Sequence, residues 1–236
     1  MLKILSIDWD YFFPNDEVYD WGHREAPFFI NTLWNFRTNT KRPDGKMMMD
    51  VHTPTVPKNF WKKVLRNTPI LTIAESHCSI WTLLDRMRVF GPIEVTNIDA
   101  HHDCGYKDGY PRRIPETFAI ECGNWGYWGL RTKRISSLRQ FYPAWRQQNP
   151  EGRVSSSKVP AVHFGLPEPD SYNAVFLCRS GAWTPPWYDD RLQQFIESSK
   201  LRVDGTLEPR ELTLGMARRQ QQAEMGMMSM LKGATA

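Results

Sequence analysis

Five short, continuous apolar runs separate segments of helical periodicity in this 236-residue sequence, and they restrict its fold more than any other feature. The runs are Leu2–Ile7, Ile70–Ala74, Ile93–Ile98, Ala161–Phe164 and Ala174–Cys178. Continuous apolar runs are typical of strands that are buried on both faces of a parallel sheet. Between them, residues 79–90 and 187–198 repeat apolar side chains at helical spacing. The alternation predicts an α/β fold with helices covering a mostly parallel central sheet.

The composition predicts a soluble, cytoplasmic globular protein. The chain is 41% hydrophobic, and its 10 Trp, 8 Tyr and 12 Phe exclude a disordered chain. A net charge of +4 is too small and too scattered for a nucleic-acid surface, and no apolar run reaches the roughly 18 residues that span a bilayer. Asp8 and Asp10 interrupt the first run, so it is no secretory signal, and the four cysteines contain no C-x-x-C pair.

The length suits one large domain, which we expect over residues 1–204. Residues 14–62 are polar and aromatic with weak periodicity, and this predicts an insertion or a lid. Residues 205–236 are expected to be a C-terminal tail. Its Met-rich stretch, Met225–Leu231, is interpreted as a short helix that either frays or binds a partner.

Metal-binding residue types follow three of the predicted strands directly. The six are Asp8, Asp10, His77, Asp99, His101 and Asp103. Ligands of open α/β sheets bind outside the carboxyl ends of the strands, so the three groups are expected to meet there. Residues two apart in an extended chain point the same way, and each group can therefore face one point while His102 points away.

The charge of these residues predicts two divalent cations. Four clustered carboxylates would repel one another, and burying them without cations would be costly. Carboxylate oxygens and imidazoles suit manganese better than a thiolate-rich zinc site would, so we expect two Mn²⁺ ions. Each motif taken alone also has a purely structural interpretation. A D-x-D pair often only caps a helix, and a single histidine after a strand is often structural. The run D-A-H-H-D at 99–103 is harder to explain in that way.

These motifs resemble those of the ureohydrolases, the family of arginase and agmatinase. D-A-H-H-D at 99–103 looks like the family's D-A-H-x-D, S-I-D-W-D at 6–10 resembles S-F-D-x-D, and E-S-H at 75–77 stands where the family has G-G-D-H. The resemblance implies that one manganese ion binds His77, Asp99, Asp103 and Asp8. It implies that the second binds Asp99, His101, Asp8 and Asp10, with Asp8 and Asp99 bridging.

The order of the motifs departs from arginase, in which D-x-D follows D-A-H-x-D. The chain is also shorter, and it lacks the glycines of G-G-D-H and the second aspartate pair of the D-x-D motif. This layout more closely resembles an arginase-like family that includes the peptide arginases, which convert arginine to ornithine in ribosomally made precursor peptides. C-G-N-W at 122–125, C-R-S at 178–180 and T-P-P-W at 184–187 also look like that family.

The resemblance covers residues 2–198 and implies a three-layer, arginase/deacetylase-like fold. It implies hydrolysis of guanidinium groups to urea, with an arginine-containing precursor peptide as the substrate and partner. No nucleic acid or membrane partner is expected, and an oligomer is compatible with this interpretation.

In such a reaction, a hydroxide held between two metal ions attacks the guanidinium carbon. The positive charge of the substrate calls for a carboxylate that binds no metal, and Glu75 and Glu121 are the candidates. The leaving amine needs a proton donor, for which His102 and His163 are candidates, although spacing turns His102 toward the core. The aromatic turn at 125–128 either packs along the substrate through cation–π contacts or is ordinary packing.

Four other functions remain open from the sequence. A haloacid-dehalogenase-type phosphatase also begins with a strand and D-x-D, but the next positions, Tyr11 and Phe12, are unlike it. A deacetylase-like zinc hydrolase shares the fold but uses one metal and fewer carboxylates. A ureohydrolase for a free guanidino compound would use the same six ligands. The fourth is a scaffold with a degraded site, against which the presence of all six ligands counts.

Overall fold

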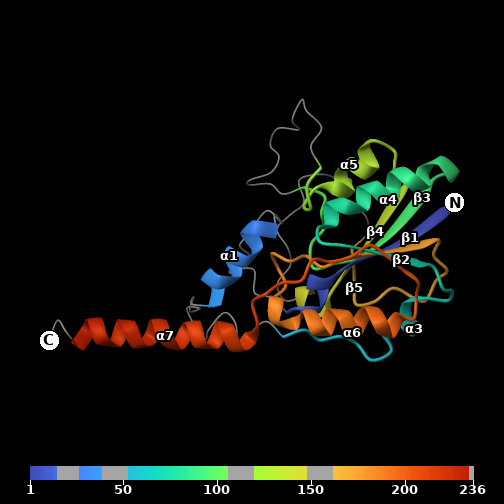
Figure 1. Cartoon of the computed structure of the whole chain (residues 1–236). Helices are drawn as coiled ribbons and strands as arrows, with labels where there is room; N and C mark the ends of the chain where they lie inside the picture. Colours follow the sequence, from blue (N-terminus) through green and yellow to red (C-terminus); the bar gives the residue numbers. More distant parts are fainter. Residues whose placement is uncertain (15–26, 39–52, 106–119, 148–161, 234–236) are drawn as a thin grey trace.

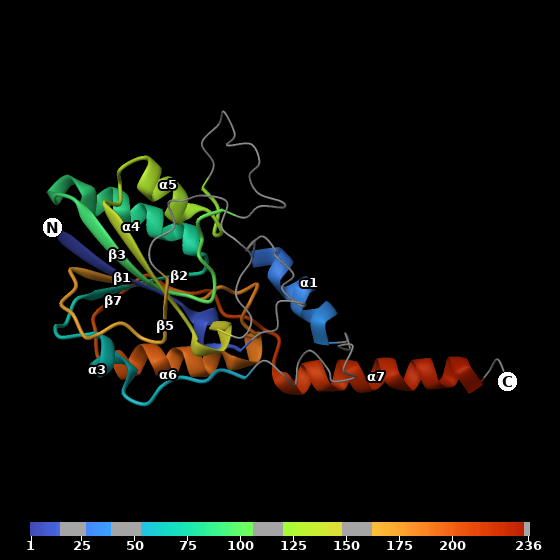
Figure 2. The ribbon, with the colours of Figure 1, turned by 180° about the vertical axis from the view of Figure 1, so that it is seen from behind.

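A seven-stranded, all-parallel sheet in the order β5-β4-β3-β1-β6-β2-β7 forms the centre of the protein (Figure 1). The computed structural model describes residues 1–14, 27–38, 53–105, 120–147 and 162–233. The strands are β1 (Leu2–Asp8), β2 (Ile70–Ala74), β3 (Ile93–Ile98), β4 (Ser137–Tyr142), β5 (Val162–Phe164), β6 (Ala174–Cys178) and β7 (Val203–Asp204). Helices lie on both faces of this sheet (Figure 2). The predicted three-layer α/β fold is therefore confirmed.

Strand β1 lies in the middle of the sheet and is paired in parallel with β3 on one side and with β6 on the other. The register places Ser6 beside Asn97, and Asp8 beside Cys178. The carboxyl ends of these three strands therefore meet at one edge, where β2 also ends beside β6.

The two faces of the sheet bury separate hydrophobic clusters. On one face, Ile4 of β1 packs with residues of α4 (Ile80–Met87) and α5 (Trp125–Arg131). On the other face, Leu5 and Ile7 pack with residues of α3 (Phe60–Val64) and α6 (Asp189–Ser199). Successive residues of a strand point to opposite faces, so β1 can be apolar along its length and serve both clusters.

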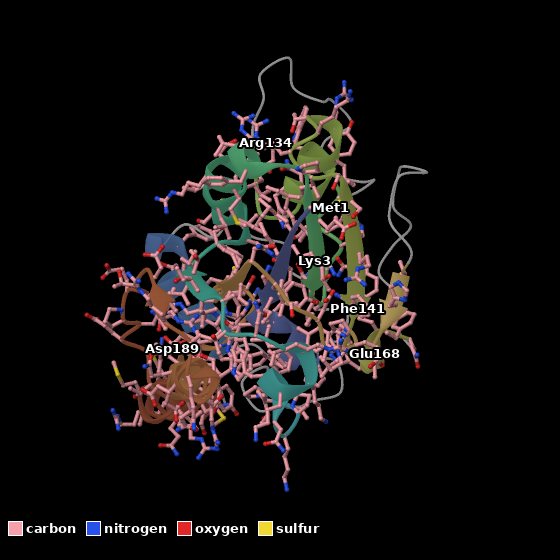
Figure 3. All side chains as sticks on the ribbon, turned by 90° about the vertical axis from the view of Figure 1, so that its right-hand side faces the viewer. Met1, Lys3, Arg134, Phe141, Glu168 and Asp189 are labelled. Atoms are coloured by element: carbon pink, nitrogen blue, oxygen red, sulfur yellow. The ribbon has the colours of Figure 1, made fainter. Side chains whose placement is uncertain are left out.

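Two further helices lie beside this body. Helix α1 (Pro27–Thr38) packs on the beginning of α7 (Leu214–Gly233), and Ile30, Trp34 and Ala217 are buried in their small shared cluster. The remainder of α7 extends away from the sheet toward the C-terminus (Figures 1 and 2). Figure 3 shows Phe141 of β4 and Asp189 of α6 on opposite sides of the molecule.

Three strand predictions, 70–74, 93–98 and 174–178, are confirmed to the residue. The first strand extends one residue further, to Asp8. Strand β5 covers Val162–Phe164, and Ala161 of the predicted strand lies outside the described residues. The prediction missed β4, in which Arg139 and Gln140 interrupt the apolar run, and the two-residue β7. A strand with such polar residues gives no continuous apolar signal.

The predicted helices are present, and others were missed. Residues 79–90 contain α4 with a 3₁₀ turn on each side, and the helix predicted at 187–198 begins at Asp189 as α6. The aromatic turn predicted at 125–128 is wrong, because these residues belong to α5. Much of the proposed lid over 14–62 lies outside the described residues, but its described part contains α1 and begins α3.

The Met-rich stretch belongs to the 20-residue α7. Its exposed methionines include Met225, Met227 and Met230. Among the described residues, no helix has both the length and the apolar character that crossing a membrane requires.

The cluster between the sheet and α6 makes a prediction about stability. Phe195 is buried and its ring lies 4.6–5.2 Å from the ring centroids of Trp9, Phe12 and Trp61. Phe195→Ala should lower the free energy of unfolding by about 3–5 kcal/mol, because it removes packed surface and leaves a cavity. Denaturant unfolding measures this change.

The matched control is Phe90→Ala, because Phe90 is 79% exposed. Its effect should stay within about 0.5 kcal/mol. Equal losses of stability in the two variants would contradict the packing described here.

Candidate metal centre

The carboxyl edge of the sheet gathers all six of the predicted ligands. Asp8 ends β1, and Asp99 follows β3 directly. His77 begins a 3₁₀ turn just after β2, and its ring packs against Trp125 and Phe176, with centroids 4.8 and 5.7 Å away. Because the strands are parallel, residues far apart in the sequence meet at this edge.

The first group of ligands surrounds the Nδ1 atom of His77. This nitrogen lies 3.1 Å from Asp8 Oδ2, 3.1 Å from Asp99 Oδ2 and 3.0 Å from Asp103 Oδ2. The other ring nitrogen, Nε2, is 2.7 Å from the hydroxyl of Ser6. The first group therefore combines one imidazole with three carboxylates.

The second group lies next to the first and shares Asp99 with it. His101 Nδ1 is 2.8 Å from Asp10 Oδ2 and 3.8 Å from Asp99 Oδ1. The two oxygens of Asp99 thus face different histidines, since Oδ2 faces His77. Potential ligand atoms lie within 4.8 Å of one another in the set Asp8, His77 and Asp99 and in the set Asp10, Asp99 and His101.

The surroundings of His77 fit a bound cation. One ring nitrogen donates at most one hydrogen, yet three carboxylate oxygens lie near Nδ1 and none makes a well-aligned hydrogen bond with it. If Nε2 donates to Ser6, Nδ1 presents a lone pair to these oxygens. A metal ion can bind the lone pairs of Nδ1 and of the three carboxylate oxygens together. A hydrogen bond at the other ring nitrogen, here Nε2, is typical of metal-binding histidines.

Burial makes the group electrostatically expensive in the absence of metal. Asp8, Asp10, Asp99 and Asp103 are at most 5% exposed. Burial, together with neighbouring carboxylates, raises the pKa of Asp8 and of Asp10, and it raises the pKa of Asp99 to about 6. Burial opposes charge on His77, but the three carboxylates close to Nδ1 outweigh it and place the pKa of His77 well above the ordinary value. Cations would neutralise this concentration of negative charge.

Neighbouring side chains fix the carboxylates in place. Asn97 Nδ2 donates to Asp99 Oδ2 at 3.0 Å, and Trp125 Nε1 donates to Asp103 Oδ2 at 2.5 Å. The Ser180 hydroxyl donates to Asp8 Oδ2 at 2.7 Å. The sequence analysis missed these supporting contacts. The order N-x-D at 97–99, at the end of β3, is a sequence signal for the contact from Asn97, since residues two apart share a face of the sheet.

The candidate ligands were predicted to face one point because residues two apart in an extended chain point the same way. This reason was wrong, because the chain is not extended through the two motifs. Asp8 Oδ1 accepts from the Asp10 amide at 3.0 Å and caps a 3₁₀ turn over residues 9–12. Asp99 Oδ1 accepts from the His101 amide at 2.7 Å, and Asp103 has a left-handed φ of 50°. Tight turns stabilised by aspartate, rather than a two-residue repeat, aim the ligands.

Glu75 was predicted to be a free carboxylate for the substrate, and the structure gives it another partner. Its Oε2 accepts from Arg179 Nε at 2.7 Å, so its charge is balanced within the protein. His102 is buried, and its Nδ1 accepts from the Cys104 amide at 3.0 Å. Burial lowers the pKa of His102 to about 4, which favours the neutral ring, and its role as a proton donor stays a prediction.

The two remaining candidates lie elsewhere. Glu121 is half-buried just before α5, where its backbone amide donates to Asn124 Oδ1 at 2.8 Å. His163 is exposed on the edge strand β5, with its ring stacked on Phe141 at 4.7 Å. Among the described contacts, neither side chain joins the six-ligand cluster. Their predicted catalytic roles stay predictions.

A small pocket opens beside the second group of ligands. Asp10 and His101 form its polar part, and three aromatic side chains stand around it. The aromatic residues are Phe13, Trp145 and Trp183. Trp183 packs on His101 with ring centroids 4.7 Å apart. Arg146 also lines the pocket, and its Nε donates to the Ala100 carbonyl at 2.8 Å, which fixes the backbone between Asp99 and His101.

Comparison with known proteins leaves the family open. No protein-family model, no curated protein and no solved structure matches this chain. The fold and the site therefore define its class by themselves: a parallel α/β protein whose buried Asp/His groups could hold a metal ion.

The shared position of Asp99 predicts the effect of Asp99→Asn on metal binding. Wild-type protein should gain thermal stability when Mn²⁺ is added, because a ligand that binds the folded state stabilises it. Asp99→Asn should lose most of this gain, because Asp99 contacts both groups. Thermal unfolding with and without Mn²⁺ measures the difference.

Asp204→Asn on the exposed strand β7 is the control, and it should respond to Mn²⁺ as the wild type does. A full metal response in Asp99→Asn would argue against a site built around this carboxylate.

Proposed function

We propose that this protein is a manganese-dependent hydrolase of the guanidinium group of arginine residues in a precursor peptide. The products would be ornithine residues and urea. The observation that carries the proposal is the position of Asp99, whose two carboxylate oxygens face two different histidine-and-carboxylate groups. The motifs around these residues, D-A-H-H-D and S-I-D-W-D, resemble those of the ureohydrolases.

The ligand set supports two manganese ions. His77 with Asp8, Asp99 and Asp103 would hold one ion, and His101 with Asp10 and Asp99 would hold the other. The resemblance to the ureohydrolases adds Asp8 to the second ion, as a second bridging carboxylate. Oxygen and imidazole ligands suit Mn²⁺, and four carboxylates balance two divalent charges. When bound, the ions would act as Lewis acids and lower the pKa of water.

The pocket beside Asp10 and His101 suits a flat cation. Trp145 and Trp183 offer aromatic faces that attract a guanidinium group. In the reaction, water gives its oxygen to the guanidinium carbon, and the bond from that carbon to the side-chain nitrogen of arginine breaks. That nitrogen takes a proton and leaves as the ornithine amine, and the carbon leaves in urea.

The composition of the pocket favours a peptide over free arginine. Free arginine carries an α-amino and an α-carboxylate group, which need charged or polar partners. Three of the seven residues around this pocket, Phe13, Trp145 and Trp183, are aromatic, and such surfaces pack well against an extended peptide. The favoured substrate is therefore an arginine side chain whose α-groups are in peptide bonds.

A direct assay tests this proposal. Protein loaded with Mn²⁺ is incubated with arginine-containing peptides, including a precursor peptide encoded beside its gene, and separately with free arginine and agmatine. We expect urea release together with the loss of mass that accompanies conversion of arginine to ornithine, and a higher kcat/KM for the peptide. Turnover of free arginine at least as fast as of every peptide would overturn the substrate assignment. Absence of urea from all substrates would overturn the hydrolase itself.

The aromatic side chains of the pocket, Phe13, Trp145 and Trp183, lead to a separate prediction for Trp145→Ala. Loss of one cation–π surface should reduce kcat/KM for the peptide about 5- to 10-fold, mainly through KM. Manganese content should not change, because Trp145 is not among the potential ligands. The exposed Phe90→Ala serves as the control and should keep wild-type kinetics. Wild-type kcat/KM in Trp145→Ala would remove this side chain from the substrate site.

A further inference from the structure

The loop after β6 contacts both groups of the metal centre. Ser180 donates its hydroxyl to Asp8 Oδ2 at 2.7 Å, and Trp183 packs its ring on His101. The turn between them is closed by backbone bonds from Trp183 and Thr184 to the Ser180 carbonyl, at 2.8 and 3.0 Å. The loop at residues 179–184 therefore contacts one candidate ligand of each group, Asp8 through Ser180 and His101 through Trp183.

Ser180 has an unusual backbone that must be held in place. Its φ is 51°, in the left-handed region that serine rarely adopts, and it is 2% exposed. Its amide donates to the Glu75 carbonyl at 3.1 Å, and the Arg179 amide donates to the Ala74 carbonyl at 2.9 Å. These bonds continue the β6–β2 ladder past the ends of the strands and aim the Ser180 side chain back at Asp8.

A partly buried ion network lies beside this backbone. Arg179 donates from Nε to Glu75 at 2.7 Å and from Nη1 to Asp189 Oδ2 at 3.1 Å. Arg210 donates from Nε to the same oxygen of Asp189 at 2.9 Å. Two guanidinium groups and two carboxylates balance in charge, and both arginine side chains are 5% exposed. Paired, hydrogen-bonded arginines of this kind lock local geometry, because removing one partner leaves a buried charge.

Arg210 also binds the loop directly. Its Nη1 donates to the carbonyls of Gly181 and Thr184 at 3.1 and 2.6 Å. Trp34 of α1 donates to the same Gly181 carbonyl at 2.7 Å. A side chain at position 181 would collide with the Glu75 carboxylate, so glycine allows this close approach. Segments around residues 34 and 210 thus hold the backbone of the loop.

We propose that Ser180 is a positioning residue for the metal ligand Asp8, and that Arg210 acts through the 180–184 loop to keep it in place. The inference rests on the metal centre of the proposed function and deepens it. It also gives the residues just beyond 204 a role, since Arg210 belongs to the segment expected to be a tail. Hydrogen bonds that orient a ligating carboxylate typically change metal affinity by 10- to 100-fold.

The test variant is Ser180→Gly, because glycine accepts the left-handed backbone and removes only the hydroxymethyl group. Binding is measured with Mn²⁺ alone by calorimetric titration, and the bound ion is examined by electron paramagnetic resonance. We expect affinity to fall at least 10-fold, with an altered spectrum of the bound ion. The thermal midpoint of the metal-free protein should stay near that of the wild type.

The matched control is Lys200→Gly, at an exposed residue with φ of 56° that caps α6. It should bind Mn²⁺ as the wild type does. A second variant, Arg210→Lys, keeps the charge but cannot reach Asp189 and both loop carbonyls together, and it should weaken Mn²⁺ binding without touching a ligand.

The outcomes separate the two proposals. If wild-type protein binds Mn²⁺ and Ser180→Gly binds it equally tightly with the same spectrum, the positioning role is wrong and the metal centre stands. If Ser180→Gly weakens binding and Arg210→Lys does not, the part assigned to Arg210 is wrong. If wild-type protein binds no Mn²⁺, the metal centre fails and this inference fails with it.

Discussion

Four buried carboxylates converge on two histidines at the carboxyl edge of the sheet, and much of the neighbouring structure compensates for this concentration of charge. Burial raises the pKa of Asp8 and Asp10 and brings that of Asp99 to about 6, because a buried carboxylate without a cation is unfavourable in its charged form. Donors from Asn97, Trp125 and Ser180 hold the carboxylate oxygens in place. A site that costs stability in this way is typical of function rather than of packing.

Most of the central sheet and the candidate ligands could be predicted, because short stretches of neighbouring residues indicate both. A continuous apolar run such as Ile93–Ile98 marks a strand, and the acidic motif directly after it marks the edge where ligands gather. Helix α5 was missed because glycines at 126 and 129 weaken its helical signal, although Gly129 allows close packing against Ile135. Asp103 reaches His77 through a left-handed turn, which a two-residue repeat cannot describe.

The network around Arg179 could not be predicted, because its members come from distant parts of the chain. Glu75 and Arg179 are 104 positions apart in the sequence, and Asp189 and Arg210 are 21 positions apart. Nothing in the local pattern distinguishes these charges from solvated surface charges, and Glu75 was taken for a substrate carboxylate. The fold brings them together beside β6, where they balance one another and hold the loop that contacts Asp8 and His101. Local patterns therefore located the candidate ligands, and only the assembled fold shows which residues support them.

The proposed metal centre requires two cations that share Asp99, and a crystal structure of the protein grown with Mn²⁺ tests this most directly. Anomalous scattering from manganese should give two peaks roughly 3.5–4 Å apart. One peak should lie among His77, Asp8, Asp99 and Asp103, and the other among His101, Asp10 and Asp99. A single peak, or manganese bound away from Asp99, would contradict the two-metal centre.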